Sequence, residues 1–235
     1  MTRIAWRVLS AVPTLFGVVL VTFLITRVLP GDPAVFFASN PSMSAEDVEK
    51  VRVALGLDKS LVQQFWIYLD ALWQGDLGNS ISTGQPVTVE MMKRLPASVE
   101  LTLFAFVLAI MVAIPLGVMA ALRPGSWIDQ ACRITATLGV SMPTFVTGLI
   151  LIYVFYFLLG IVPEPTGRLD PFLFKPPHVT GLIIPDALIA GEGATALSAL
   201  RQILLPAITM ALFALAPLAR MTRASMLSTL SAEFV

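Results

Sequence analysis

The sequence predicts an all-α fold: a polytopic bundle of membrane helices, with a small helical insertion outside the membrane after the first helix. Composition is one reason, because 57% of the 235 residues are hydrophobic and 13% are charged, whereas soluble domains carry about 25% charged residues. The arrangement of the apolar residues in long blocks is the other, since a hydrocarbon layer about 30 Å thick requires such lengths. We expect four membrane helices, at about residues 9–28, 97–122, 134–162 and 203–219.

The first block is interpreted as a membrane helix that is not removed. Arg3 and Arg7 precede it, as basic residues precede the apolar part of a signal peptide. However, the apolar stretch is too long for a signal peptide, and residues 29–33 (Leu-Pro-Gly-Asp-Pro) do not form a small-residue cleavage site. The segment therefore predicts a retained first helix.

A polar region, residues 30–93, follows and contains the start signals of two short helices. Ser44 opens an S-x-x-D pattern, and the helix that it begins should end at Gly56. Ser60, with Gln63 three residues later, begins the second helix. The rings of this second helix either anchor it at the membrane surface or pack within the region, and the sequence leaves both open. These aromatic residues are Phe65, Trp66, Tyr68 and Trp73.

The basic residues predict the orientation of the chain. With the N-terminus in the cytoplasm, the inner segments contain only Asp129 and Glu233 as acids, and the outer segments are richer in acids than in bases. Inner segments of membrane proteins carry an excess of arginine and lysine close to the helix ends. We therefore expect a multi-pass protein with a cytoplasmic N-terminus. The inner basic residues are Arg3, Arg7, Arg123, Arg133, Arg220 and Arg223.

Patterns of enzyme chemistry are missing from the sequence. Residues 139–143 (Gly-Val-Ser-Met-Pro) match a nucleophile elbow at three positions, but proline replaces the closing glycine and no histidine lies at membrane depth. No Gly-rich loop is followed by Lys-Ser/Thr, as ATP binding of the Walker type requires. Cys132, expected in a short inner loop, and His178, in the proline-rich outer loop 163–202, do not make a metal site. We expect no catalytic residue, metal, cofactor or nucleic-acid partner.

Ionisable residues are scarce inside the predicted spans. Only Glu100 and Arg201 lie near one, and both are at its outer edge. Carriers driven by protons or ions usually need buried ionisable groups. The energy for any transport is therefore expected to come from outside this chain.

Helix-breaking residues also occur within the spans. They either kink helices along a translocation path or reflect the ordinary frequency of proline and glycine in membrane helices, and the sequence leaves both open. These residues are Pro115 with Gly117, Pro143 with Gly139, Pro206 and Pro217.

An ordered set of short motifs resembles the permeases of dipeptide, oligopeptide and nickel ATP-binding-cassette (ABC) importers. The set covers essentially the whole chain and is therefore more specific than any single motif. It consists of PTLFGV at 13–18, LPGDPA at 29–34, GDLG at 75–78, LPASVELTL at 95–103, SMPTF at 141–145, TGR at 166–168, LPAIT at 205–209 and RMTRASML at 220–227.

This resemblance implies a type I importer fold with six membrane helices in a bacterial inner membrane. Its implied partners are a second homologous permease, two cytoplasmic ATPase subunits, an extracytoplasmic substrate-binding protein and the lipid bilayer. Residues 1–94 would form the first helix and the extracytoplasmic helical region, and residues 95–235 part of the transmembrane domain. The family continues after residues 231–235 into a loop that docks into an ATPase groove. We therefore expect a C-terminally truncated chain that has four of six helices and no transport activity of its own.

The resemblance also implies the function and the site residues. The leading interpretation is a permease that passes peptides inward, without an ATPase site of its own. The alternatives are nickel uptake, a secondary transporter or channel, and a non-transporting membrane scaffold. Residues of the translocation pathway would include Ser141, Pro143 and Thr144. Residues of the ATPase-coupling region, which could equally be topology signals, would be Arg220, Thr222, Arg223, Ser225, Glu233, Phe234 and Val235.

Overall fold

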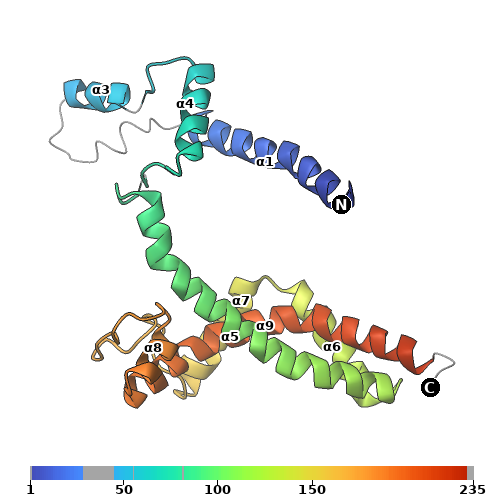
Figure 1. Ribbon diagram of the computed structural model, residues 1–235. Coiled ribbons are helices and arrows are strands. Elements are labelled where there is room, and N and C mark those ends of the chain that lie inside the picture. Colours follow the sequence, from blue (N-terminus) through green and yellow to red (C-terminus); the bar gives the residue numbers. More distant parts are fainter. Residues whose placement is uncertain (1, 29–44, 55, 81, 232–235) are drawn as a thin grey trace. The chain divides into compact units, whose positions relative to one another are not determined.

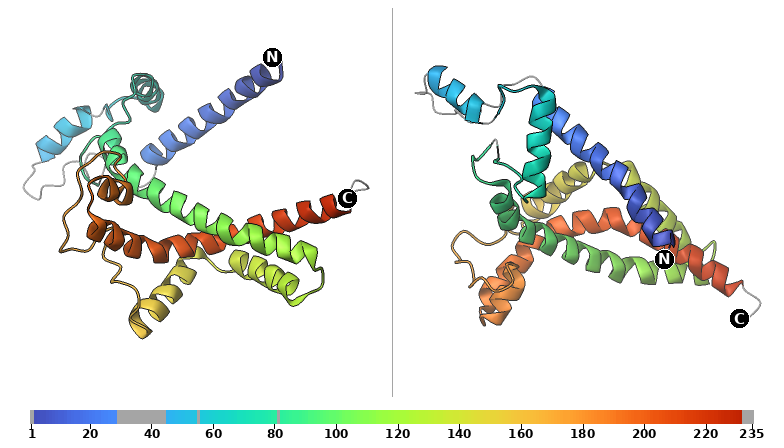
Figure 2. Two further views of the ribbon diagram at one scale, coloured as in Figure 1. Left: turned by 60° about the horizontal axis from the view of Figure 1, so that its bottom comes forward. Right: turned by 45° about the horizontal axis from the view of Figure 1, so that its top comes forward.

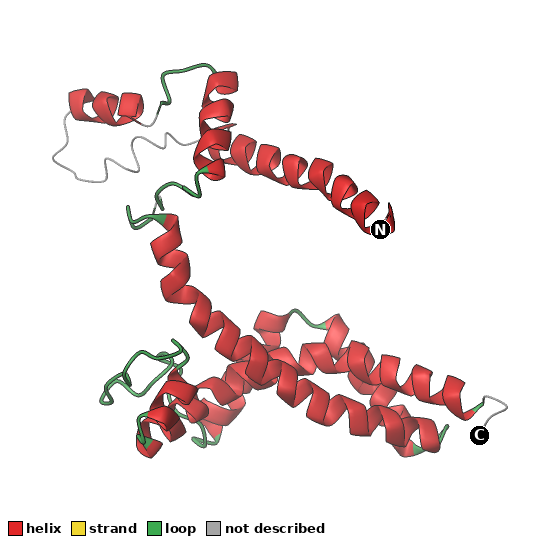
Figure 3. Ribbon diagram, viewed as in Figure 1, coloured by secondary structure: helices red, strands yellow, loops and turns green. Residues whose placement is uncertain are grey.

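A computed structural model describes residues 2–28, 45–54, 56–80 and 82–231. Helices make up the regular structure of this described part (Figures 1 and 3), which confirms the predicted all-α fold. The chain divides into two compact units, Met1–Lys93 and Arg94–Val235, which we describe separately. The helices are α1 (Thr2–Val28), α3 (Ala45–Ala54), α4 (Leu61–Trp73), α5 (Val87–Leu122), α6 (Trp127–Ser141), α7 (Thr144–Leu151), the π-helix η1 (Ile152–Leu158), α8 (Ile183–Ile189) and α9 (Gly193–Leu230).

The short helices of the first unit begin and end where local sequence signals place them. The Ser60 hydroxyl accepts a hydrogen bond from the Gln63 amide at 3.4 Å, and the Gln63 side chain accepts one from the Ser60 amide at 3.3 Å. This reciprocal pair confirms the predicted start of α4. Helix α3 stops just before Gly56, whose φ of +66° is the left-handed conformation that ends many helices. Ser44 lies outside the described residues.

The aromatic helix α4 uses its rings in two ways. Phe65 contacts Phe23 of α1 edge to face, with ring centroids 5.1 Å apart, and Tyr68 lies 5.7 Å from the same ring. Trp66 and Trp73, by contrast, are 66% and 92% exposed. One face of α4 therefore packs on α1, as one of the two interpretations predicted, while an interfacial role of the tryptophans stays a prediction.

Helices α5, α6 and α9 lie side by side in the second unit (Figure 2), and small residues form much of their contact. Those on α5 recur mostly every four residues and therefore lie on one side of the helix. Small side chains let membrane helices approach closely, so contacts between backbones replace the packing of large apolar groups. The buried small residues include Ala105, Ala109, Ala113, Gly117, Ala120 and Ala121 on α5, and Ala207, Ala211, Ala216 and Ala219 on α9.

Cys132 belongs to this contact, so its predicted place in a loop was wrong. Its side chain is buried in α6 against Ala113 and Ala120 of α5 and Leu215 of α9. The loop between α5 and α6 is short because Ser126 caps α6 immediately after it. The helix therefore starts earlier than the apolar block, which begins at residue 134.

The predicted helix breakers act differently from one another. Helix α5 continues through Pro115 and Gly117, and α9 continues through Pro206 and Pro217. Neighbouring helices and local adjustments can satisfy the carbonyl groups that a proline leaves free in a membrane helix. Gly117 is instead a packing position, as shown below.

Pro143 does interrupt its helix, so the predicted span 134–162 is not one continuous helix. Met142 is extended, with φ −103° and ψ 134°, between the end of α6 and the start of α7. A proline ring disfavours the helical conformation of the preceding residue, which explains the break. Within the described residues, three helical segments are long and apolar enough to cross a membrane, Leu9–Arg27, α5 and α9, while Thr144–Leu158 is a shorter apolar helix.

Asp186 of α8 organises the loop that precedes it. Its carboxylate accepts hydrogen bonds from the Thr180 amide at 2.7 Å, the Thr180 hydroxyl at 2.6 Å and the Gly181 amide at 3.0 Å. Burial of the carboxyl raises its pKa, but these bonds, with one from the Val179 amide, favour the charged form more strongly. The pKa of Asp186 is consequently lowered to about 2.

We expect the stability that Asp186 contributes to depend on pH in a defined window. Because the pKa in the folded chain lies below the ordinary value of 3.8, the contribution is complete above that value and is lost as the pH falls towards 2. The melting temperature of Asp186→Asn should therefore be below that of the unchanged protein at pH 6. This difference should shrink as the pH falls from 4 to 2, and most of it should be gone at pH 2. Thermal unfolding in detergent measures this. Glu164→Gln, an exposed carboxyl in the same loop, is the control; a difference for Asp186→Asn that is constant with pH would contradict the assignment.

Candidate functional site

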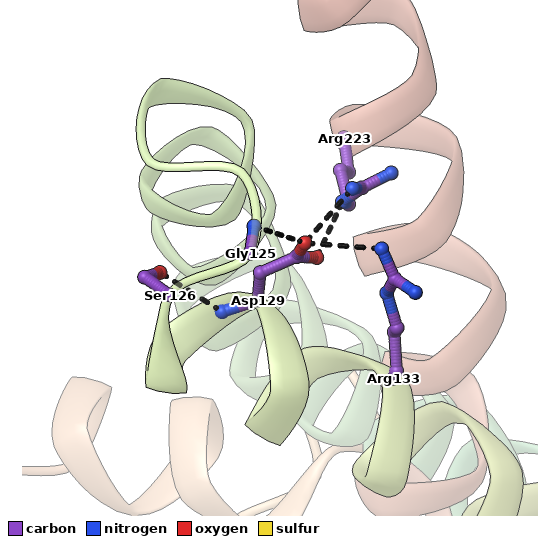
Figure 4. Close-up of polar contacts among 5 residues, drawn as sticks. All are labelled: Gly125, Ser126, Asp129, Arg133 and Arg223. Carbon is purple, nitrogen blue, oxygen red and sulfur yellow. Dashed lines mark hydrogen bonds and ion pairs between the residues drawn. The ribbon is translucent and has the colours of Figure 1, made fainter.

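The clearest polar site is the Asp129 cluster, which comprises Gly125, Ser126, Asp129, Arg133 and Arg223 (Figure 4). Ser126 is the N-cap of α6, and its hydroxyl accepts a hydrogen bond from the Asp129 amide at 3.4 Å. This cap places Asp129 in the first turn of α6, where the helix dipole favours a negative charge. The local sequence thus fixes the carboxylate at the start of α6.

Arg223 of α9 reaches across to this carboxylate with two nitrogens. Its Nε lies 2.7 Å from Oδ1 of Asp129 and its Nη2 lies 3.0 Å from Oδ2. Oδ2 also accepts hydrogen bonds from the Gly125 amide at 3.0 Å and from Arg133 at 3.2 Å. Only 1% of the Asp129 surface is exposed. Two-pronged pairs of arginine and carboxylate are among the strongest and most directional hydrogen-bonded contacts in proteins.

The cluster holds Asp129 in its charged form. The hydrogen bonds from Arg223 are the largest influence and keep the pKa of Asp129 well below its usual range, and the Gly125 amide acts in the same direction. Burial opposes this effect, and Arg133 adds a smaller lowering of the pKa. One buried carboxylate therefore faces two guanidinium groups at all physiological pH values.

Thr222, the residue before Arg223 on α9, contacts α5 at Gly117. A Cβ atom added at Gly117 of α5 would lie 2.7 Å from Cβ of Thr222 and 2.8 Å from the carbonyl oxygen of Ala219. Such distances are shorter than van der Waals contact, so only glycine fits at this point of α5. Consecutive residues of α9 thus fix this helix against α5, through Thr222, and against α6, through Arg223.

The residues predicted for the coupling region therefore have different environments. The Arg223 guanidinium is bound within the chain, and Thr222 packs against α5. Arg220 and Ser225 are exposed. Glu233, Phe234 and Val235 lie outside the described residues. From the sequence alone, Asp129 was only an acid among the inner basic residues; the S-x-x-D pattern at residues 126–129 was the signal that could have placed it at a helix start.

A second polar contact involves Glu100 of α5, which is 6% exposed. Its Oε2 pairs with the guanidinium of Arg168, and its Oε1 accepts a hydrogen bond from the Ile184 amide at 2.8 Å. Glu100 therefore ties both the loop after η1 and the first turn of α8 to α5. The predicted position of Glu100 at the edge of a span did not reveal either partner, because both are distant in sequence.

Two adjoining cavities lie beside this contact. The larger, of about 500 Å³, is lined by α7, η1, α9, Leu101 of α5 and the loop that follows η1. The smaller, of about 210 Å³, is lined by Glu100 and Arg168 among others. Both are lined by Leu101, Gly167, Gln202 and Pro206.

One of the three predicted pathway residues, Thr144, lines the larger cavity. Pro143 is exposed and precedes α7. Ser141 is the last residue of α6, and its side chain lies outside the described part of the chain. A pathway role of these three residues stays a prediction.

Comparisons with known proteins give consistent matches along the chain. Residues 113–235 match the family of binding-protein-dependent transport system inner membrane components, and residues 1–102 match the N-terminal domain of such membrane components. The probable D,D-dipeptide transport system permease protein DdpB of Escherichia coli K12 is 43% identical over 219 residues, which are 93% of this chain and 64% of that protein.

Two further relatives are similar over nearly the same stretch. The di/tripeptide transport system permease protein DppB of Pseudomonas aeruginosa UCBPP-PA14 is 40% identical over 99% of this chain and 68% of its own length. The dipeptide transport system permease protein DppB of Escherichia coli K12 is 35% identical over 95% of this chain and 66% of its own length. The chain thus spans about two thirds of the length of these relatives, between 64% and 68%. It belongs to the family of binding-protein-dependent transport system inner membrane components, as the motif resemblance predicted.

Proposed function

We propose that this chain acts as the permease subunit of an ABC importer for short peptides. A second homologous permease would complete the membrane path, two cytoplasmic ATPases would supply the energy, and an extracytoplasmic binding protein would deliver the peptide. The observation that carries the proposal is the 40% identity with a di/tripeptide permease over 99% of the chain. The apolar helices α1, α5 and α9 support a place in the bacterial inner membrane.

The arginines support an orientation with the N-terminus in the cytoplasm. Arg123 lies in the short connection between α5 and α6, Arg133 lies in the second turn of α6, and Arg220 and Arg223 lie near the end of α9. If these segments face the cytoplasm, the distribution follows the excess of basic residues on that side. The Asp129 cluster then lies on the side where the ATPases act.

The Asp129 cluster would transmit movement in this importer. The hydrogen bonds between Arg223 and Asp129 join the end of α9 to the start of α6. A displacement of α9 by an ATPase would move α6, and the break at Met142 would let α7 and the cavity beside it respond separately. Rigid-body movement about a few extended residues is a common means of switching access.

Reconstitution in proteoliposomes tests the proposed function. The protein that carries this chain is combined with its second permease, its ATPases and its binding protein, and uptake of a labelled dipeptide is measured. We expect accumulation that needs hydrolysable ATP and the binding protein, and that persists when ionophores abolish the membrane potential. Uptake driven by a proton gradient without ATP would identify a secondary carrier instead. Uptake of nickel but not of peptide would reject the peptide substrate, and failure to co-purify with any ATPase would favour a scaffold.

A further inference from the structure

Arg201 introduces a positive charge into the lining of the larger cavity. It lies on α9 two residues before the apolar block 203–219, and it is the one ionisable residue among the described residues that line this space. Within the described part of the chain, neither an ion pair nor a hydrogen bond engages its guanidinium. The nearby hydroxyl of Thr209 already donates to the Leu205 carbonyl at 2.9 Å.

The rest of the lining is mainly apolar. It includes Phe145, Ile152, Leu205 and Met210, together with the polar side chains of Thr144 and Gln202. A volume of about 500 Å³ falls within the range of small-molecule sites, which is roughly 300–1,000 Å³. Arg201 is exposed, and no contact among the described residues engages its guanidinium, so this cation is free to pair with an anion at the edge of the apolar surface. The lining therefore suits a small ligand with one anionic end and an apolar body.

Glu100, the acidic residue beside the cavities, is already paired and does not serve as the anionic partner of Arg201. The carboxylate of Glu100 already accepts from Arg168 and from the Ile184 amide. Arg168 in turn is neutralised by Glu100, although its side chain is 38% exposed. Arg201 is thus the cation that a ligand entering the larger cavity meets without an intramolecular competitor among the described residues.

We propose that Arg201 binds the terminal carboxylate of the transported peptide, while the apolar lining of the larger cavity receives its side chains. This assignment rests on the proposed function and names the group through which the permease contacts its substrate. A carboxylate matches the planar donors of arginine in a two-pronged contact, which an amide or a hydroxyl does not. Arg201 would therefore favour peptides with a free C-terminus over C-terminal amides.

The test compares two substrates in the reconstituted importer. One is a labelled dipeptide and the other is its C-terminal amide analogue, chosen so that the binding protein has equal affinity for both. We expect the ratio of acid uptake to amide uptake to fall about tenfold in Arg201→Gln, since the loss of one charged contact changes affinity by about this factor. Arg201→Lys, which keeps the charge but not the planar donors, should give an intermediate ratio. Lys175→Gln removes an exposed cation from the loop after η1, and its ratio should equal that of the unchanged importer.

The outcomes separate this assignment from the alternatives. An unchanged ratio in Arg201→Gln, with uptake of both substrates reduced equally, would overturn it and indicate a structural role. An equal reduction that appears only in vesicles containing phosphatidylglycerol, and not in phosphatidylcholine vesicles, would overturn it in favour of a contact with lipid phosphate. Failure of the proposed function is distinguishable from both, because the unchanged importer would then show no ATP-dependent uptake of either peptide.

Discussion

Replacing Asp129 with asparagine is expected to loosen the attachment of α9 to α6 and to abolish most of the ATP-driven uptake. An amide side chain cannot accept both nitrogens of Arg223, and its own NH₂ group would face one of them or Arg133. Two guanidinium groups would then lie beside a neutral residue in a site that is 1% exposed at position 129. We expect the melting temperature of the protein in detergent to fall by about 5 °C or more, a typical effect of breaking a buried charge pair in a chain of this size.

A double-mutant cycle isolates the contact between Asp129 and Arg223. The loss in Asp129→Asn with Arg223→Gln should be smaller than the sum of the two single losses, because the contact between these two side chains can be lost only once. Arg220→Gln is the matched control: Arg220 is exposed on α9, three positions before Arg223, so its replacement should leave the melting temperature unchanged. Additive losses in the cycle would show that the two side chains do not act as a pair.

Replacing Gly117 with alanine is expected to force α5 away from α9. The added methyl group would lie 2.7 Å from Cβ of Thr222 and 2.8 Å from a backbone oxygen of α9. Neither atom can rotate away, since one is fixed to the backbone and the other is part of it. Overpacking of this kind costs about 1–3 kcal/mol, and we expect Gly117→Val to cost more. Thermal unfolding and the yield of folded protein after membrane extraction measure the effect.

Two variants test this explanation of the Gly117 effect. Gly17→Ala on α1 adds the same methyl group where no atom lies within 4 Å, so it should be neutral or stabilising, because alanine favours the helix over glycine by about 1 kcal/mol. Thr222→Ala should not rescue Gly117→Ala, since it keeps both the Cβ atom and the backbone oxygen that the new methyl group meets. Full rescue by Thr222→Ala would mean that the Thr222 side chain beyond Cβ sets the helix spacing.

The two predictions affect neighbouring residues of α9 but different kinds of contact. Thr222 packs closely against Gly117 of α5, whereas Arg223 forms an ion pair with Asp129 at the start of α6. Loss of either should free the end of α9 that leads to the proposed ATPase side. We therefore expect both Asp129→Asn and Gly117→Ala to reduce uptake, and the reduction should accompany a loss of thermal stability in each.

Local properties of the sequence predicted α1, α3, α4, α5 and the apolar part of α9, but not α8, which lies in the predicted loop 163–202. In a bilayer the backbone groups must bond within their own segment, so a long apolar block specifies a helix without knowledge of its neighbours. The box formed by Ser60 and Gln63 and the glycine after α3 depend on residues a few positions apart, and their predicted roles were confirmed. The family followed from motifs spread over the chain.

Contacts between distant segments could not be predicted in the same way. Asp129 and Arg223 are 94 positions apart, and Glu100 and Arg168 are 68 positions apart. Composition and spacing did not show that Gly117 is a packing position, that Cys132 is buried in α6, or that Pro143 breaks a helix while Pro115 does not. Each of these outcomes depends on the rotation of one helix about its axis and on its distance from the next. The sequence by itself determined where the long apolar helices lie and which residues are apolar or charged; the tertiary structure decided which of those residues meet, because the facing sides of two helices are set by packing all of their side chains together.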